Sequence, residues 1–407
     1  MTATTDLLAK GRKFYVPNYK PRELIIDRGK GAHIWDLDGN EYIDFGAGIA
    51  VASLGYNDED LIRALEAQAH KIWHTSNIFF TAPPIELAEA LVEASRFATR
   101  VFFCNSGGEA NEAAIKLARK CAAERGKPPE QRQIITFTGS FHGRTLTTVT
   151  ATAQPKYQQG FEPLPQGFAY APFNDFDAIE KMMGDHVCAV MVETIQGEGG
   201  VMPMRPGFLA HLRALTERHG ALLMVDDVQA GMGRTGKLFS HWWEPGVTPD
   251  VVTLAKGLGG GMPIGAMLAG ANCADVLQFG SHGSTFGGNP LATSVAHVVL
   301  KKLQTPALTE NVEARSAQLI AGLEELGGKF GLFKEIRGRG LMLGAELTEA
   351  WHGKAGEIGD AARRCGVLVL QAGPNVLRFL PPLVITEPDV AQGLEYLSRA
   401  LEKLPAA

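Results

Sequence analysis

The sequence predicts an α/β fold in which a large domain with a mostly parallel sheet precedes a small α+β domain. Short continuous apolar runs occur at residues 187–192, 221–225 and 251–255, and runs of this length are typical of strands that are buried on both faces. A charged residue follows each run, which places three charged side chains at the carboxyl edge of the sheet, where α/β proteins bind ligands. The 407 residues are enough for one large core and a second, smaller one.

The N-terminal part of the chain predicts a hairpin and two helices. Residues 33–45 alternate between apolar and polar side chains and turn at residues 38–40, whereas the residues before them look irregular. Apolar residues then recur at helical spacing over 58–70. A second helix is expected at 83–94, because its two prolines fall in the first turn, where proline is tolerated.

The large domain is expected to continue with alternating strands and helices. Further strands are expected at 100–104 and 133–137, and residues 265–270 are expected to form a strand that returns along the sheet. Helices are expected at 110–123 and 291–303, each after a glycine-rich loop.

The character of the chain changes near residue 305. The expected C-terminal elements are helices at 309–326, 356–365 and 387–402, a pair of strands at 336–344, and single strands at 367–371 and 376–382. We therefore expect an N-terminal segment of residues 1–57 that packs with the small domain, a large domain of residues 58–305 and a small domain of residues 306–407.

The composition argues against several classes of partner and site. The net charge of −5 and the pI near 6.1 argue against nucleic acid and anionic membrane surfaces as partners. No apolar stretch approaches the roughly 20 residues that a membrane span needs, and the N-terminus lacks the apolar core of a signal peptide. The five cysteines are scattered and form no CxxC pair, which favours a reducing cytosol and argues against a metal site.

Asp226 and Lys256 are the candidate catalytic residues, because they end two neighbouring buried runs. A carboxylate and a lysine at one sheet edge, beside glycine-rich loops, suit the cofactor pyridoxal 5'-phosphate (PLP). The lysine would bind the aldehyde of PLP covalently, and the acid would keep the pyridine nitrogen protonated. An acid at a strand end is usually a turn former, and a lysine before glycine is usually solvated, so the interpretation depends on the surrounding residues.

Two loops could bind the phosphate of such a cofactor. Residues 105–109 read Asn-Ser-Gly-Gly-Glu between a strand and a helix, and the free amides and dipole of a helix N-terminus favour an anion. A capped helix without a ligand explains the same residues, and both interpretations stay open. The polar loop 281–290 also offers small hydroxyl groups.

Two further loops add polar groups to the same edge. Phe141, His142 and Arg144 could stack on a ring and bind a carboxylate, although Phe141 could equally be core and Arg144 a surface ion pair. Glu193 and Glu198 follow the run that ends at residue 192.

Taken together, these loops resemble the class III family of PLP-dependent aminotransferases, and the resemblance covers essentially the whole chain. Any one phrase is a weak signal, but so many phrases in this order are highly specific. The phrases are NSGGEANEAAIKLAR at 105–119, GSFHGRT at 139–145, QGEGG at 196–200, GMGRTG at 231–236, GGGMPIGAMLAG at 259–270, HGSTFGGNPLA at 282–292, RGRGLMLG at 337–344 and LRFLPPLVIT at 377–386. The resemblance implies fold type I of the PLP-dependent transferases.

The resemblance also implies which residues contact the cofactor. Lys256 would hold PLP covalently and then move a proton, and Asp226 would pair with the pyridine nitrogen. The remaining contacts would come from Val228 and Phe141 on the two faces of the ring, Gln229 near its phenolic oxygen, Ser106, Gly107 and Gly108 at the phosphate, His142 and Glu193, and Thr285, with Ser284 beside it, from the neighbouring subunit. A site shared in this way implies an obligate homodimer.

Two arginines would bind the substrates. Arg144, helped by Tyr19, would bind the α-carboxylate of the amine donor. Arg378 would bind the α-carboxylate of glutamate or 2-oxoglutarate, and Arg144 would then bind the distal carboxylate. Glu198 would pair with Arg378 while the donor is bound and swing aside for the dicarboxylate, because an unpaired buried charge is costly.

Five positions depart from the common pattern of the family. They are Asp227 in place of glutamate, Thr194 in place of proline, Tyr56-Asn57 in place of histidine and a small residue, and Gly108 in place of alanine or threonine. None touches the catalytic pair or the arginines, so they bear on substrate preference. The shorter Asp227 is expected to shift a hydrogen bond near the ring.

Within the family, the chain is most similar to members that transfer the terminal amine of N2-acetylornithine to 2-oxoglutarate, which gives N-acetylglutamate 5-semialdehyde and glutamate in bacterial arginine biosynthesis. Succinylornithine, ornithine and 4-aminobutyrate are alternative donors. A semialdehyde mutase is disfavoured, because Arg378 and Glu198 suit two dissociable substrates.

Two interpretations outside this class carry less support. The interpretation of the chain as a dinucleotide-binding dehydrogenase is supported only by the glycine-rich run 257–261. This run does not open a helix in a strand–turn–helix unit. An inactive scaffold is disfavoured because Lys256 and Asp226 are both retained.

Overall fold

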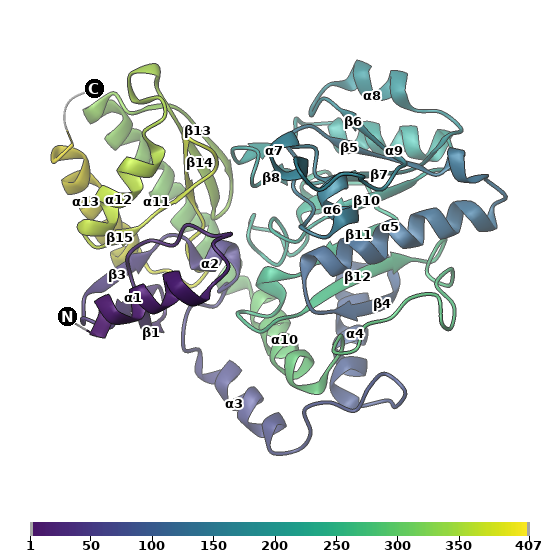
Figure 1. The fold of residues 1–407 in the computed structure, drawn as a ribbon, viewed down its shortest axis with the longest axis horizontal. Helices are drawn as coiled ribbons and strands as arrows, with labels where there is room; N and C mark the ends of the chain where they lie inside the picture. Colours follow the sequence, from purple (N-terminus) through teal and green to yellow (C-terminus); the bar gives the residue numbers. More distant parts are fainter. Residues whose placement is uncertain (1–2, 405–407) are drawn as a thin grey trace.

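The computed structural model describes residues 3–404, which form a larger body around a seven-stranded sheet and a smaller body that holds both ends of the chain (Figure 1). The strands of the large sheet are β4 (Ala98–Cys104), β5 (Gln133–Phe137), β6 (Phe168–Ala171), β7 (Val187–Val192), β10 (Leu222–Asp226), β11 (Val251–Leu254) and β12 (Gly265–Gly270). Their order is β4-β12-β11-β10-β7-β5-β6, and within this sheet β12 alone runs in the direction opposite to the other six strands. The expected mostly parallel sheet with one returning strand is confirmed.

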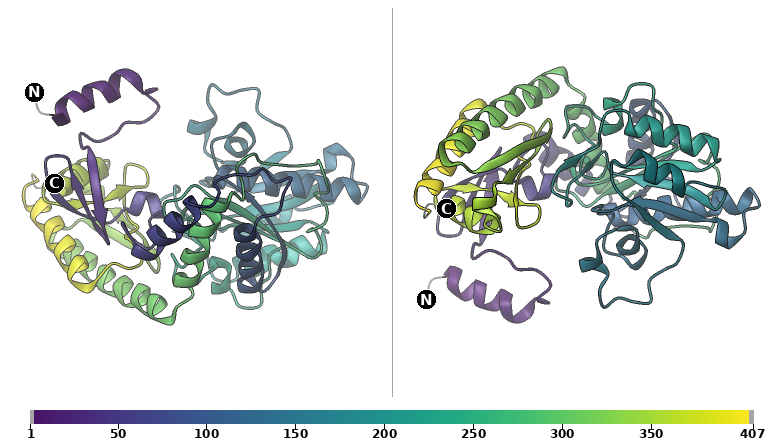
Figure 2. Two further views of the ribbon diagram at one scale, coloured as in Figure 1. Left: turned by 90° about the horizontal axis from the view of Figure 1, so that it is seen from below. Right: turned by 90° about the horizontal axis from the view of Figure 1, so that it is seen from above.

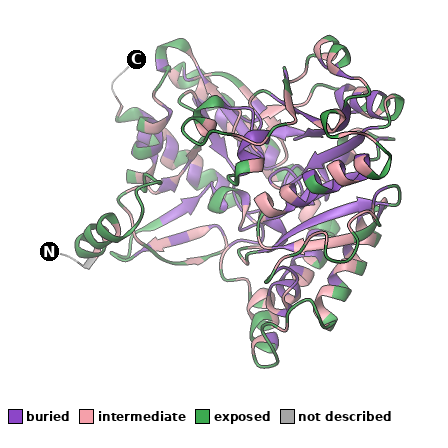
Figure 3. Cartoon of the chain, turned by 45° about the vertical axis from the view of Figure 1, so that its right-hand side comes forward, coloured by how far each residue is buried: buried purple, intermediate pink, exposed green. Residues whose placement is uncertain are grey.

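Helices cover both faces of the large sheet, so its central strands are fully buried (Figure 3). The continuous apolar runs of β7, β10 and β11 reflect this, because a strand covered on both faces has no polar side. The helices and single turns of this body are α3 (Glu59–Ala69), α4 (Ala82–Ser95), α5 (Gly107–Glu124), α6 (Leu146–Ala151), α7 (Pro155–Gln158), α8 (Phe176–Met182), α9 (Phe208–Arg218), α10 (Pro290–Leu303), η1 (Pro129–Gln131), η2 (Ser240–Trp243) and η3 (Lys256–Leu258). A small ribbon of β8 (Ile195–Gln196) and β9 (Met202–Pro203) follows β7.

The smaller body contains two four-stranded sheets. One pairs β13 (Phe333–Arg339), β14 (Met342–Leu347), β17 (Val376–Phe379) and β16 (Leu370–Gln371), and the other pairs β1 (Ile26–Lys30), β2 (His33–Asp36), β3 (Glu41–Asp44) and β15 (Val367–Leu368). The remaining elements are α11 (Pro306–Phe330), α12 (Ala355–Arg364), α13 (Glu387–Glu402), the turn η4 (Glu349–Trp351) and the left-handed turn α2 (Ala47–Ala50). The expected hairpin is therefore present as β2 and β3.

The segment predicted as one strand at 367–371 is divided between the two small sheets. Residues Val367–Leu368 pair with β3, whereas Leu370–Gln371 pair with β17. Val369 lies between them and is buried. A run of apolar residues indicates extended backbone but does not say which neighbour it pairs with, so this division could not be read from the sequence.

The N-terminal residues are more regular than the sequence indicated. A helix, α1 (Ala3–Phe14), and the strand β1 precede the hairpin. Helix α1 stands apart from the rest of the small body (Figure 2), and most of its side chains are exposed. Its few apolar residues explain why the sequence did not predict it. No helix within residues 3–404 is long and apolar enough to cross a membrane.

Candidate functional site

A cavity of about 580 Å³ opens at the carboxyl edge of the large sheet. The ends of β5, β7, β10 and β11 meet there with the N-terminus of α5. The predicted residues that line the cavity are Ser106, Gly107, Gly108, Phe141, His142, Arg144, Glu193, Asp226, Val228, Gln229 and Lys256. The structure therefore brings most of the predicted cofactor residues to one place.

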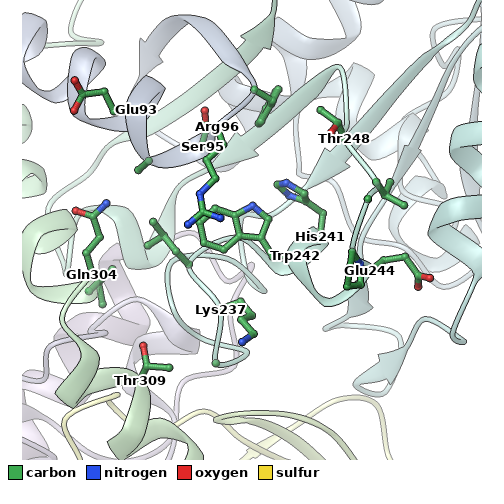
Figure 4. Close-up of a pocket in the computed structure, with 18 of the residues that line it drawn as sticks. Glu93, Ser95, Arg96, Lys237, His241, Trp242, Glu244, Thr248, Gln304 and Thr309 are labelled. Carbon is green, nitrogen blue, oxygen red and sulfur yellow. The ribbon is translucent and has the colours of Figure 1, made fainter.

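A larger cavity of about 990 Å³ lies elsewhere, beside the C-terminal end of α4 and residues 236–248 (Figure 4). Arg96 lies over the ring of Trp242, and His241 is buried among aromatic rings. None of the predicted site residues lines this cavity. The chemistry expected from the sequence therefore belongs to the smaller cavity.

Lys256 follows β11 directly and begins the turn η3. Its backbone adopts a positive φ of 38°, which is uncommon for a residue with a side chain and is typical of functional sites. Burial lowers the pKa of its ammonium group to about 8, and the charges of Glu198 and Arg378 act on it with opposite signs. A lysine with a lowered pKa supplies more neutral amine, the form that reacts with an aldehyde.

Asp226 lies at the end of β10 and accepts hydrogen bonds from three nitrogen atoms. His142 Nδ1 lies 2.7 Å from its Oδ2, Asn111 Nδ2 donates to the same oxygen over 2.8 Å, and the backbone amide of Val228 donates to Oδ1 over 3.1 Å. The carboxylate is nearly fully buried yet lines the cavity. An acid held in this way can present its remaining lone pairs to a ligand nitrogen.

Two more titratable groups crowd around Asp226. Burial lowers the pKa of His142, but the hydrogen bond that His142 donates to Asp226 and the charges of Asp226 and Glu193 outweigh it, so the pKa of His142 is raised. Burial raises the pKa of Glu193 to about 8, with the charges of His142 and Lys256 opposing it. Glu193 also accepts a hydrogen bond of 2.9 Å from the backbone amide of Phe141, which ties β7 to the loop after β5.

The N-terminus of α5 offers free amides to the cavity. The Ser106 hydroxyl caps the helix by accepting from the amide of Glu109 over 3.2 Å. The amides of Gly107 and Gly108 donate to no residue between 3 and 404, as expected for a first helical turn. Both interpretations of this turn therefore hold in part, because the helix is capped and still presents two free donors to an anion.

The small size of Gly107 is required by its neighbour. A Cβ at Gly107 would approach Val228 Cγ1 to 2.7 Å, so a larger residue would displace Val228. Val228 and Phe141 both line the cavity, as two residues that enclose a flat ring would. The donor set, the lysine and the free amides together fit PLP.

Arg378 on β17 and Glu198 after β7 form an ion pair beside the cavity. Arg378 also donates to the carbonyl oxygen of Gly197 over 3.1 Å and to Gln229 Oε1 over 3.4 Å, and its Nε has no partner among the described residues. The guanidinium is 3% exposed and Glu198 is half-buried. A buried arginine with a partly exposed acidic partner and an unused donor is suited to a second carboxylate.

Arg144 projects from the loop after β5 and stacks on two aromatic rings. Its guanidinium carbon lies 4.1 Å from the ring centre of Tyr157 and 5.2 Å from that of Phe141. Tyr157, on α7, was not predicted. Its sequence context, a single tyrosine after Gln-Pro-Lys, gives no signal that it meets Arg144.

Five predicted residues do not line the cavity of a single chain: Arg378 and Glu198, which lie beside it, and Thr285, Ser284 and Tyr19. Thr285 is exposed and lines a separate cavity of about 230 Å³ with Phe79 and Phe80. Ser284 accepts a hydrogen bond of 3.1 Å from Asn105 Nδ2, and Asn105 directly precedes the N-terminal turn of α5. Tyr19 is 82% exposed on the N-terminal arm.

Two of the positions that depart from the family pattern are joined by one hydroxyl group. Thr194 Oγ1 donates to Ser240 Oγ over 2.6 Å, and Ser240 donates in turn to the carboxylate of Asp227. Asp227 is fully buried and does not line the cavity, so its shorter side chain does not act at the ring directly. Burial raises the pKa of Asp227 to about 7, although the hydrogen bonds that the hydroxyl and the backbone amide of Ser240 donate to its carboxylate oppose this increase.

Asn111 is the residue that the sequence argument missed at the centre of the site. It lies on the buried face of α5 among alanines and is 1% exposed. An asparagine on an otherwise apolar helix face was the available signal. Within the described residues, no cluster of histidine, cysteine or acidic side chains could hold a metal ion.

The sequence profile of the family described as aminotransferase class III matches residues 14–401 of the chain. The chain is 61% identical over 403 residues to the acetylornithine aminotransferase of Xanthomonas campestris, and the match covers 98% of both chains.

Two solved structures are similar over nearly the full length. The N-acetylornithine aminotransferase of Stenotrophomonas maltophilia is 51% identical, with a TM-score of 0.86 over 97% of this chain and 98% of that one. An ornithine aminotransferase of Toxoplasma gondii, described with partial occupancy of PLP at its active site, is 35% identical, with a TM-score of 0.94 over 98% of this chain and 94% of that one.

Proposed function

Because the chain belongs to the class III aminotransferases, we propose that it uses PLP to transfer the terminal amine of N2-acetylornithine to 2-oxoglutarate, giving N-acetylglutamate 5-semialdehyde and glutamate. The observation that carries this proposal is the meeting of Lys256, Asp226 and the free amides of α5 around one cavity. The reaction would serve arginine biosynthesis in the cytosol.

PLP, when bound, supplies an electron sink that allows an amino group to leave one substrate and enter another. The amides of Gly107 and Gly108 would hold its phosphate at the N-terminus of α5. Val228 and Phe141 would hold its ring from the two faces, and Gln229 would contact its phenolic oxygen. Asp226 would hold a proton at its ring nitrogen.

Lys256 would have two tasks. Its neutral amine, favoured by the lowered pKa, would hold the cofactor covalently. The same amine would also accept a proton from the substrate carbon as a general base and donate a proton as a general acid.

The two arginines would allow one site to accept two substrates. Arg144 binds the α-carboxylate of the amine donor, while Glu198 keeps the charge of Arg378 neutralised. When 2-oxoglutarate enters, Glu198 moves aside, Arg378 takes the α-carboxylate and Arg144 the distal one. Charge-assisted bonds between arginine and carboxylate give this geometry its specificity.

The active unit would be a homodimer with Thr285 and Ser284 contributed across the interface. Large apolar side chains are exposed in two segments, residues 72–80 and 279–286, and Phe79 and Phe80 line the same cavity as Thr285. The exposed side chains are Ile72, Trp73, Ile78, Phe79, Phe80, Phe279 and Phe286. An exposed apolar surface of this kind is typical of a protein–protein contact. Tyr19 would join the donor site from the N-terminal arm.

The donor is tested by a single half-reaction. The purified protein should carry the visible absorption band of bound PLP, and N-acetylornithine added without a keto acid should bleach it. Adding 2-oxoglutarate should then restore the band. The Lys256→Ala variant is the control, because it should not complete the conversion.

Competing donors decide between members of the class. Ornithine, 4-aminobutyrate and succinylornithine should bleach the band more slowly than N-acetylornithine at equal concentration. If one of them bleaches it much faster, the proposed donor is wrong and the cofactor assignment stands. If no band forms even after reconstitution with PLP, the proposed reaction is wrong as a whole.

A further inference from the structure

Asn111 joins four elements around the candidate acid. Its amide nitrogen donates to the carbonyl oxygen of His142 over 2.7 Å and to Asp226 Oδ2 over 2.8 Å. Its amide oxygen accepts from Thr253 Oγ1 over 2.7 Å. These bonds connect helix α5, the loop after β5, and the strands β10 and β11.

Thr253 fixes which way the amide of Asn111 faces. An amide presents two donors on one side and an acceptor on the other, and the Thr253 hydroxyl occupies the acceptor side. Both donors of Asn111 then point to oxygen atoms, those of His142 and Asp226. If the amide turned over, its oxygen would face the carboxylate of Asp226 and the two would repel each other.

As a consequence, the two carboxylate oxygens of Asp226 differ in their hydrogen bonds. Oδ2 accepts from both His142 and Asn111, so its lone pairs are in use. Among residues 3–404, Oδ1 accepts only the longer bond of 3.1 Å from the amide of Val228. Since Asp226 lines the cavity, Oδ1 is the oxygen left with capacity for a ligand.

We propose that Asn111, oriented by Thr253, is a positioning residue that keeps Oδ2 of Asp226 occupied and presents Oδ1 to the ring nitrogen of the cofactor. The inference rests on the proposed function, because it assumes that PLP binds with its nitrogen at Asp226. Asn111 lies one turn from Gly107 on α5, so the same bonds hold the phosphate donors and the acid at a fixed separation.

The first test changes Thr253, which does not line the cavity. Thr253→Val removes the hydroxyl and conserves the volume, whereas Thr253→Ser restores the hydroxyl. The dissociation constant of PLP from the apoprotein, measured by absorbance titration, should rise about three- to tenfold in Thr253→Val, as the loss of one buried hydrogen bond implies. Thr253→Ser should return close to the original value.

Thr136→Val is the matched control. Thr136 lies on β5 of the same sheet, is fully buried, and its hydroxyl has no partner among the described residues. The control should bind PLP like the unchanged protein. An equal loss in Thr136→Val and Thr253→Val would overturn the inference, and so would unchanged binding in Thr253→Val.

A cofactor analogue separates positioning from general packing. In the analogue, carbon replaces the ring nitrogen, so Asp226 has no ring N–H to accept. The unchanged protein should bind the analogue more weakly than PLP, and Thr253→Val should weaken analogue binding no further. A loss of the same size with PLP and with the analogue would show that Thr253 acts elsewhere.

A second variant keeps the inference testable if Thr253→Val does not fold. Asn111→Ala should show the same pattern, weaker binding of PLP and little added effect on the analogue. Equal effects on both would overturn the inference. If the unchanged protein binds no PLP at all, the proposed function fails first, and the two failures are thereby distinguishable.

Discussion

At the scale of single residues, the burial of Lys256 has a consequence that can be measured. Burial lowers the pKa of Lys256 to about 8, so the neutral amine predominates above that pH and the ammonium below it. The rate at which the apoprotein binds PLP covalently should therefore rise with pH. The rise should have its midpoint at a pH of about 8, and the rate should be constant well above that pH.

The measurement is the growth of the absorption band after mixing apoprotein with PLP across a pH series. An exposed lysine would keep gaining rate toward its ordinary pKa of 10.5. A rate that still climbs through that range would contradict the burial argument. Lys256→Ala, which has no amine at this position, controls for attachment to surface lysines.

The site residues that could be predicted from the sequence are those that directly follow a buried strand. Asp226, Lys256 and Glu193 were predictable, because each is a charged residue directly after a continuous apolar run. Asn111 and Tyr157 were not predicted, because their importance lies in contacts with distant residues, Asp226 and Arg144. The link between Thr194 and Asp227 through Ser240 is of the same kind, since it joins three loops that are far apart in the sequence.

At the scale of elements, the short helix α7 carries the aromatic ring against which the guanidinium of Arg144 stacks. Tyr157 on α7 faces Arg144 at 4.1 Å, and cation–π contacts at exposed sites are worth about 0.5–1 kcal/mol. Tyr157→Leu should therefore raise the KM for N-acetylornithine roughly two- to fivefold and leave kcat nearly unchanged. Tyr157→Phe, which keeps the ring, should behave like the unchanged protein.

Steady-state kinetics with both substrates check this expectation. Lys156→Gln is a matched control, because Lys156 also lies over the Tyr157 ring, at 4.7 Å, whereas Arg144 is the cation on that ring that lines the cavity. If Tyr157→Leu lowered kcat while KM stayed constant, the tyrosine would not act through carboxylate binding.

The elements themselves were predictable to different degrees. The long helices α5, α10 and α13 were expected at nearly their observed positions, because their apolar spacing is regular. Six of the seven strands of the large sheet were expected from short, mainly apolar runs, whereas β6 was not predicted. The pairing partners of short strands were not predictable, as the division between β15 and β16 illustrates.

At the scale of the whole molecule, the proposed dimer predicts complementation between two damaged subunits. Lys256→Ala and Thr285→Ala homodimers should each have reduced activity. In the mixed dimer, one site would combine the intact Lys256 of one subunit with the intact Thr285 of the other, and would regain activity.

Co-expression with two different affinity tags isolates the mixed dimer for assay. If Thr285 served the site of its own chain, every site of the mixed dimer would carry a defect and no activity would return. Gel filtration of the unchanged protein should show a dimer, since the proposed partner would cover the exposed apolar side chains of residues 72–80.

The proposed division into segments 1–57, 58–305 and 306–407 finds support in one strand pairing. Strand β3 pairs in parallel with β15, with Ile43 opposite Val367. The N-terminal hairpin therefore belongs with the C-terminal body, and the large domain is inserted between them (Figure 1).

The pairing of β3 with β15 also means that β3 is synthesised long before its partner strand. Ile43 leaves the ribosome long before Val367 is made, and at about 5–20 residues per second the interval is roughly 15–65 seconds. During this time the hairpin has an open edge, and an unpaired edge invites association with other chains. The nascent chain is therefore expected to need chaperone protection at its first fifty residues until its last domain has emerged.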